Sequence, residues 1–348
     1  GDAPARAAEV IAGEQSSGTF IALPGETPEL KARAGARVER LEVLETVSQP
    51  SLPVMRPGLR YTRCTLELSW PIENLGPCLP TLMATIAGNL FELRCVTGLR
   101  LTDLQLPPSF AVAYPGPAFG IAGTRRLAGV PSGPLIGTII KPSVGLSPEQ
   151  TAEQVRQLVD GGIDFIKDDE LQADGPHCPF DERVRAVMRV VNDAAQRTGK
   201  KAMVAFNLTG DLDKMRRRHD LVLAEGGTCV MVSLNSVGLA GLIALRRHAQ
   251  LPIHGHRNGW GMLNRHPLLG IEFRAYQTLW RLAGSPGQAE TARCLPLERA
   301  GVPVRFLGLR RRPSNEGVAP RDREGERRTE LLLLASSHDE RRRSRAMR

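Results

Sequence analysis

The stretch GGIDFIKDDE places Lys167, Asp169 and Glu170 directly after an apolar run. Side chains alternate along a strand, so Lys167 and Asp169 share a face, and Glu170 joins them if the strand ends there. Two carboxylates suit Mg²⁺, a hard cation that takes oxygen ligands. A lysine fits beside them once CO₂ has converted its amine into a carbamate, which is a third anionic oxygen ligand. A solvated charged loop after a strand is the alternative interpretation.

Lys141 ends a second apolar run, in GTIIKPSVGLSPEQ, just before Pro142. A lysine that is desolvated near a metal can have its pKa lowered into the range of a general acid or base. We therefore count Lys141 as a candidate for proton transfer. A surface or helix-end lysine is the alternative.

The third stretch is PIHGHRNGWG, in which His254 and His256 alternate onto one strand face and Arg257 follows. Arginine suits bidentate phosphate binding, and histidine suits proton transfer, so all three are candidate substrate or catalytic residues. A zinc pair would need a third nitrogen or sulfur ligand, and the sequence offers none nearby. Four polar residues after apolar runs can line the same mouth: Asn207, Thr209, Ser233 and Asn235.

The elements that must position these residues form a regular series. Short β-rich runs occur over residues 135–140, 163–166, 202–206, 229–234 and 252–254, with helical patterns between them. Successive βα units predict a (β/α)8 TIM-type barrel, of which about five strands are recognisable, with the site at the carboxyl ends of the strands.

Helix signals support this series. Ser147 and Gln150 form a capping box with Pro148 at the first helical position. An apolar stripe over 184–194 predicts a second helix, and a third is expected before the glycine pair 226–227.

The first part of the chain predicts a smaller α+β domain. Residues 64–70 alternate as in a half-buried strand, and 79–90 can form a helix. The proline- and glycine-rich stretch 107–134 predicts a linker or boundary. We therefore expect an N-terminal domain over 1–115, a partial barrel domain over 116–284 and an arginine-rich tail over 285–348, for which we expect disorder or a frame-shifted sequence.

Charge and cysteine content limit the function classes. The tail holds 15 arginines, no lysine and 9 acidic residues, so most of the formal net charge of +9 lies there. An RNA-binding role of this tail is a weaker alternative, and we expect no nucleic-acid and no membrane partner. Without a signal-peptide pattern or a long apolar run, we expect a cytoplasmic protein. Six scattered cysteines are expected to be reduced and mostly buried: Cys64, Cys78, Cys95, Cys178, Cys229 and Cys294.

Three motifs together resemble RuBisCO large chains. GTIIKPSVGLS, DFIKDDE and IHGHRNG, in this order and spacing, resemble the family's first, second and fifth barrel strands. Upstream, GEQSSGTF, AGNLFEL and LRLTDLQLPPSF resemble its N-terminal domain, which is ferredoxin-like in that family. The resemblance covers roughly residues 8 to 284.

The resemblance implies roles for the candidates. Lys167 would be the carbamylated lysine, with Asp169 and Glu170 as Mg²⁺ co-ligands. Lys141 would transfer protons, His256 would be an acid–base or hydroxyl-binding residue, and Arg257 would bind phosphate. Three residues match positions that the family contributes across a homodimer to the partner's barrel: Glu14, Thr19 and Asn89.

Departures from the family pattern indicate the branch. RuBisCO has a second lysine two positions after the first, where this chain has Ser143, and Trp260 replaces a histidine. Such changes are typical of RuBisCO-like (form IV) proteins, which act on methylthio-sugar phosphates or in the degradation of apionate-type sugar acids. We expect a Mg²⁺-dependent isomerase, enolase, decarboxylase or transcarboxylase/hydrolase that forms an enediolate from a phosphorylated sugar or keto acid.

Two alternatives stay open. Authentic CO₂ fixation on ribulose bisphosphate is one. An inactive, truncated fragment is the other, because no sixth strand, loop lysine or glycine-rich phosphate site is recognisable after Gly284. The N-terminal domain also lacks its beginning when compared with the family pattern. The arginine-rich tail resembles a frame-shifted translation of the family's later strands.

Overall fold

The computed structural model describes residues 3–18, 23–53, 60–114, 116–172 and 174–284, and the backbone of 302–307. The chain divides into two compact units. The first holds the described residues within 1–118, 234–246 and 257–323, and the second holds those within 119–233 and 247–256. No helix among the described residues is long and apolar enough to span a membrane.

The second unit is built on five parallel strands. In spatial and sequence order they are β4 (Gly137–Ile139), β5 (Phe165–Lys167), β6 (Met203–Asn207), β7 (Cys229–Ser233) and β8 (Ile253–His256). Lys167 lies opposite Ile139 and Ala205, and Ser233 lies opposite His256, so the carboxyl ends meet at one edge. This curled half-barrel confirms the predicted (β/α) barrel class.

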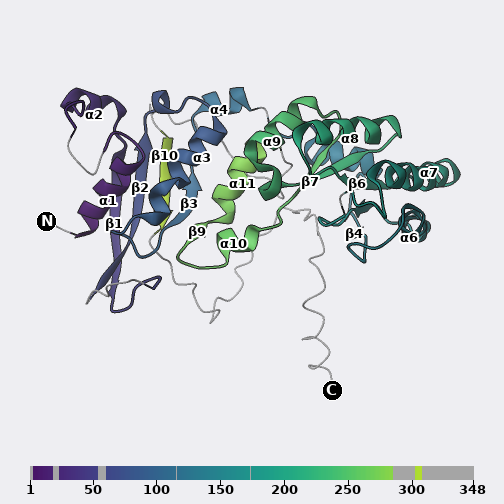
Figure 1. Cartoon of the computed structure of the whole chain (residues 1–348), viewed down its shortest axis with the longest axis horizontal. Coiled ribbons are helices and arrows are strands. Elements are labelled where there is room, and N and C mark those ends of the chain that lie inside the picture. The colour runs from purple at the N-terminus through teal and green to yellow at the C-terminus, as the bar shows by residue number, and fades with distance from the viewer. Residues whose placement is uncertain are drawn as a thin grey trace, which may run out of the picture. The chain divides into compact units, whose positions relative to one another are not determined.

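Helices alternate with these strands. They are α5 (Gly120–Ala128), α6 (Pro148–Asp160), α7 (Phe180–Thr198), α8 (Leu212–Ala224) and α9 (Leu234–His248), whose residues up to Arg246 belong to the first unit. The predicted capping box of α6 is confirmed, because Ser147 Oγ accepts from the Gln150 amide and Gln150 Oε1 accepts from the Ser147 amide. Gly199, at φ +74°, ends α7 in the left-handed conformation that favours glycine. Helices α6 and α7 pack side by side (Figure 1).

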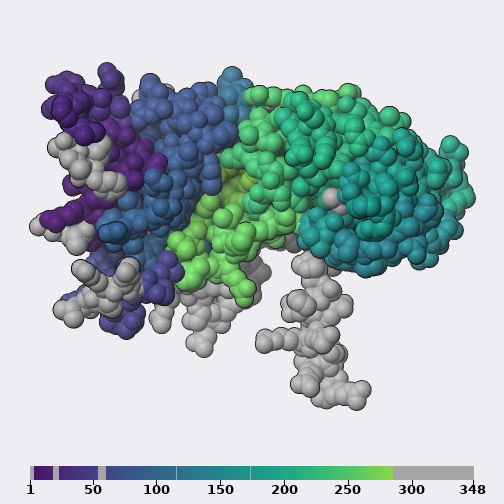
Figure 2. All heavy atoms as spheres, viewed as in Figure 1, coloured from purple at the N-terminus to yellow at the C-terminus, as the bar shows by residue number. Residues whose placement is uncertain are grey.

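The core of the second unit fills one end of the half-barrel. Every residue of β6 and β7 is buried. A buried apolar cluster joins α5 to the inner strands: Ala128, Leu135, Met203, Ala205, Cys229 and Met231. The helices α6, α7 and α8 form the closely packed teal surface in Figure 2. The last residues of β6 and β7, Asn207 and Ser233, are polar and also buried.

The first unit is an α+β structure, as predicted. Its sheet has the order β1-β2-β10-β3-β9, with β1 (Arg37–Val47), β2 (Tyr61–Trp70), β10 (Val302–Leu307), β3 (Arg100–Leu104) and β9 (Gly270–Ile271). Its helices are α1 (Ala3–Glu14), α2 (Pro28–Ala34), α3 (Leu79–Ala87), α4 (Pro108–Ala113), α10 (Trp260–Asn264) and α11 (Phe273–Leu282), with 3-10 turns η1 (Ile72–Asn74) and η2 (Asn89–Glu92). The alternation over 64–70 buries Leu66, Leu68 and Trp70.

Three expectations need correction. The stretch 107–134 holds the predicted boundary, between Ala118 and Phe119, but it is not a plain linker, because α4 and α5 form within it. A proline suits the first turn of α4. Residues 302–307 form strand β10 between β2 and β3, where backbone pairing with both neighbours outweighs the polar composition of the tail. Of the five cysteines that the structure describes, only Cys178 and Cys229 are buried. Cys294 and the rest of the tail lie outside the described residues.

Candidate functional site

The candidate metal ligands come from the end of β5. Lys167 is the last residue of the strand and is half-buried, and Asp169 is 1% exposed. Asp169 Oδ1 accepts a hydrogen bond from the Leu171 amide at 3.0 Å, so the turn itself fixes this carboxylate. Glu170 is partly exposed, and its Oε2 lies 3.6 Å from Nε2 of His256 on β8. The predicted residues Lys167, Asp169, Glu170 and His256 thus gather at one edge of the sheet.

Lys141, which follows β4, joins this group. Its Nζ donates to Asp169 Oδ2 at 2.6 Å and to Ser143 Oγ at 2.8 Å. Burial tends to raise the pKa of Asp169, but hydrogen bonds from Lys141, the Leu171 amide and Ser143 outweigh it and lower the pKa. The pair is therefore an ammonium ion on a carboxylate, with Ser143 beside it.

The surroundings of Lys167 favour the neutral form of its amine. Burial lowers the pKa of its amine, and the charge of Lys141 acts in the same direction, while Glu170, Asp169 and Asp168 oppose the shift. A lowered pKa increases the fraction of neutral amine, which is the form that attacks CO₂. A carbamate and two carboxylates would give an all-oxygen donor set, so the residues present fit a hard divalent cation such as Mg²⁺.

The two histidines of β8 differ in their surroundings. His256 faces Glu170, as described above. His254 packs against Phe165, with ring centroids 5.4 Å apart. Burial, with the nearby charges of Lys167 and His256, lowers the pKa of His254 to about 3, so this ring is neutral near pH 7.

The predicted phosphate ligand and the three residues predicted to reach a partner subunit lie in the first unit or outside the described residues. Arg257 is exposed, and its guanidinium carbon lies 5.5 Å from the centroid of the Phe273 ring. Glu14 ends α1, and Asn89 begins η2, which contacts α1. Thr19 lies outside the described residues.

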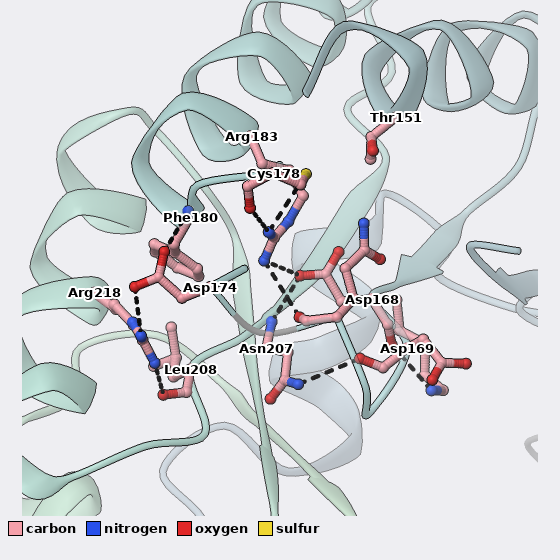
Figure 3. Close-up of polar contacts among 12 residues, drawn as sticks. Thr151, Asp168, Asp169, Asp174, Cys178, Phe180, Arg183, Asn207, Leu208 and Arg218 are labelled. Carbon is pink, nitrogen blue, oxygen red and sulfur yellow. Dashed lines mark hydrogen bonds and ion pairs between the residues drawn. The ribbon is translucent and has the colours of Figure 1, made fainter. Parts of the chain in front are cut away.

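A buried ion pair that no sequence motif had indicated lies beside the site. Asp168 is fully buried and its Oδ2 lies 3.3 Å from Nη2 of Arg183 on α7 (Figure 3). Strand alternation was the available signal, since it directs Asp168 to the face opposite Lys167 and Asp169. The polar strand-end residue Asn207 was predicted to line the mouth, but it is fully buried beside this pair.

One other cluster among the described residues has metal-binding residue types, namely His219, Asp220 and His248. Asp220 Oδ1 lies 2.9 Å from His219 Nδ1 and 2.6 Å from His248 Nε2. The Gln250 amide donates to His219 Nε2 at 3.1 Å, so the ring proton of His219 must sit on Nδ1. A protonated Nδ1 donates to Asp220 and has no lone pair for a metal. This cluster therefore ties α8 to the end of α9.

Two family models match the chain. The model described as the ribulose bisphosphate carboxylase large chain catalytic domain matches residues 120–293, and that of the N-terminal domain matches residues 1–110. Together they match most of the described residues of both units, but not strand β10.

Named relatives point to one branch of this family. The chain is 72% identical over 284 residues to the 3-oxo-isoapionate-4-phosphate transcarboxylase/hydrolase of Xanthobacter autotrophicus, covering 82% of this chain and 69% of that protein. It is 46% identical over 278 residues to the 3-oxo-isoapionate-4-phosphate decarboxylase of Rhizobium etli, covering 80% and 67%. A solved rubisco-like protein from Burkholderia fungorum is 50% identical, with a TM-score of 0.75, covering 81% of this chain and 68% of that one. The chain thus spans about two thirds of the length of the relatives it matches.

Proposed function

The chain belongs to the ribulose bisphosphate carboxylase large chain family, and from this we propose that it is a RuBisCO-like enzyme acting on a phosphorylated 3-oxo sugar acid. The observation that carries the proposal is the convergence of Lys141, Lys167, Asp169 and Glu170 at the ends of β4 and β5. The names of the transcarboxylase/hydrolase and decarboxylase relatives supply the substrate class, 3-oxo-isoapionate 4-phosphate.

A 3-oxo acid suits this site chemically. When the bond to the carboxyl carbon breaks, its electron pair stays on the neighbouring carbon, and the 3-oxo oxygen takes up the negative charge as an enolate. Lys141 Nζ, oriented by Ser143 and Asp169, is the group that would then deliver a proton to that carbon. Decarboxylation and carboxyl transfer share this intermediate.

We assign the metal site to Lys167 as a carbamate, with Asp169 and Glu170. The carbamate forms when the neutral amine of Lys167 adds to CO₂, which makes a new N–C bond and releases one proton. A Mg²⁺ ion held there would act as a Lewis acid on the substrate's carbonyl oxygen. His256, 3.6 Å from Glu170, would hold a substrate hydroxyl or exchange a proton with it.

The other predicted residues complete the proposal. Arg257 would bind the substrate phosphate through its guanidinium group. His254, neutral near pH 7, would take part only as a hydrogen-bonding group. Glu14, Thr19 and Asn89 would reach the barrel of a partner subunit in a homodimer. Carboxylation of ribulose bisphosphate finds less support, because Ser143 stands where the carboxylases have a second lysine.

The test is turnover of 3-oxo-isoapionate 4-phosphate by the purified chain with Mg²⁺ and bicarbonate, followed as release of the carboxyl group. We expect turnover that is abolished by EDTA, and none with ribulose bisphosphate. Fixation of labelled bicarbonate into 3-phosphoglycerate would reject the proposal in favour of authentic carboxylation. No turnover of this substrate by a folded, metal-binding chain that does turn over another keto acid or sugar phosphate would reject the substrate class. No turnover of any such substrate would favour the inactive fragment.

A further inference from the structure

Asp168 stands between two proposed metal ligands but faces the interior. Its Oδ2 accepts from the Asn207 amide at 2.9 Å and lies 3.3 Å from Arg183 Nη2. Side chains of Asp168, Asn207 and Arg183 are each at most 1% exposed. A buried ion pair with a third hydrogen-bonding partner has little freedom to rearrange, because each group depends on the others to offset its desolvation. The contacts of the Asp168 side chain with Asn207 and Arg183 therefore hold the backbone in place at this residue.

Asn207 holds the next two residues from the neighbouring strand. Its Nδ2 donates to the backbone carbonyls of Asp169 and Glu170, at 3.3 and 3.2 Å. One side-chain amide thus donates hydrogen bonds to two successive peptide groups of the proposed ligand segment. Figure 3 shows the bond to Asp169. This restricts the backbone torsions that aim both carboxylates.

The amide of Asn207 is oriented in turn by β7. Its Oδ1 accepts from Thr209 Oγ1 at 2.6 Å and from the Thr209 amide at 3.1 Å. Thr209 Oγ1 itself accepts from the Ser233 amide at 2.9 Å. Since Oδ1 receives two donors, Nδ2 must point toward the ligand segment, and a relay of hydrogen bonds connects the ends of β7, β6 and β5.

A second arginine holds the middle of the same loop, which connects β5 to α7. Arg218 Nη2 donates to Asp174 Oδ2 at 2.8 Å, and its Nη1 donates to the carbonyls of Leu208 and Thr209. The guanidinium carbons of Arg183 and Arg218 each lie 5.3 Å from the centroid of the Phe180 ring. The loop after β5 is therefore held to the loop after β6 at two points, its start and its middle (Figure 3).

We propose that Asn207, oriented by Thr209, is a positioning residue that aims Asp169 and Glu170, with the Asp168–Arg183 pair as its anchor. It touches no reacting atom and acts only through the backbone of the ligand segment. This inference rests on the proposed metal site. Hydrogen-bonding partners behind metal ligands commonly control affinity because they fix the orientation of the donors.

The test is Mn²⁺ binding in bicarbonate buffer, measured by calorimetry on the full chain. Asn207→Ala is expected to weaken Mn²⁺ binding about tenfold to a hundredfold. Thr209→Val should weaken binding in the same direction, and Thr209→Ser, which keeps the hydroxyl, should restore it. Asn192→Ala is the matched control, because Asn192 Nδ2 also donates to a backbone carbonyl, that of Glu225 at 3.2 Å, and should bind Mn²⁺ like the wild type.

A merely structural role would give a different pattern. Wild-type affinity in a cooperatively folding Asn207→Ala chain would overturn the proposal, and so would equal binding by Thr209→Val and Thr209→Ser. The threonine pair decides the question if Asn207→Ala does not fold.

A metal-free measurement separates this inference from the proposed function. If the wild type binds no Mn²⁺, the proposed metal site fails, and hydrogen exchange of the Leu171 amide then judges the positioning role. Exchange should be faster in Asn207→Ala than in wild type and Asn192→Ala. Equal exchange rates in all three chains would reject the positioning role as well.

Discussion

Lys141 Nζ lies 2.6 Å from Asp169 Oδ2, although the two residues are 28 positions apart in the chain. The Asp169 side chain is 1% exposed and that of Lys141 is 55% exposed, so the lysine covers the carboxylate from the solvent side. The proposed proton donor and a proposed metal ligand are thus already in contact.

Replacing Lys141 should separate chemistry from metal binding. Lys141→Met removes the proposed proton donor and should lower turnover by about a hundredfold or more. It should not weaken Mn²⁺ binding, because it removes a cation that competes for Asp169. Lys214→Met is the control, since Lys214 is exposed and its ammonium lies 3.5 Å from Asp211. Loss of metal binding together with turnover would contradict the assignment; calorimetry and the turnover assay measure the two effects.

The carbamate of Lys167 should begin to form at a lower pH than the carbamate of an exposed lysine. Burial lowers the pKa of this amine, and the neutral form increases as the pH rises through that pKa. With ¹³C-bicarbonate, a carbamate signal should grow in the NMR spectrum as the pH is raised, and it should be absent in Lys167→Arg. A signal that persists in this variant would assign the carbamate to another lysine.

His254 should make the fold sensitive to acid. Its pKa is about 3 in the folded chain and near 6.5 when unfolded, so the unfolded state binds the extra proton between these values. The free energy of unfolding should therefore fall as the pH drops from about 6.5 toward 3. Urea unfolding at two pH values should show a smaller fall for His254→Phe than for wild type. The exposed residue His177 gives the control His177→Gln, which should keep the wild-type fall; an equal fall in His254→Phe would argue against this cause.

The buried pair Asp168–Arg183 should couple strongly to stability. Removing one partner, as in Arg183→Met or Asp168→Asn, is expected to cost about 3–5 kcal/mol, and the double variant less than the sum. Burial raises the pKa of Asp168 against the opposing charge of Arg183. In Arg183→Met the unpaired carboxyl can take up a proton, so this variant should regain stability as the pH falls.

Asp168→Asn should not regain stability in this way, because the guanidinium group it leaves behind stays charged. Denaturant unfolding of the four chains at two pH values measures both effects. Additive single costs would show that the two side chains do not interact.

The proposed homodimer with shared active sites predicts complementation between subunits. Glu14→Ala and Lys167→Met should each be inactive alone. Every site needs Glu14 from one subunit and Lys167 from the other, so each homodimer of a variant lacks one of the two residues in both sites. Unfolded together and refolded as a mixture, they should recover about a quarter of wild-type turnover, because half of the dimers then hold one intact site of two. A mixture as inactive as its parents would mean that Glu14 and Lys167 act within one chain.

Local patterns along the chain predicted much of the fold. The alternation of β-rich runs with helical stripes, and the Ser147–Gln150 capping box, depend on residues close in sequence, and both were confirmed. Residues 302–307 were missed because their pairing depends on β2 and β3, more than 190 positions earlier.

The sequence by itself also determined the family and the segment that carries the proposed metal ligands, because motif order and strand alternation are read directly from the residues. Only the tertiary structure decided which side chains meet: Lys141 with Asp169, Asp168 with Arg183, and Asn207 with the carbonyls of Asp169 and Glu170. Asn207 had looked like one more polar residue at a strand end. A side chain's partners depend on the packing of neighbouring strands and helices, and no spacing within one segment encodes which distant donor will reach a buried acceptor.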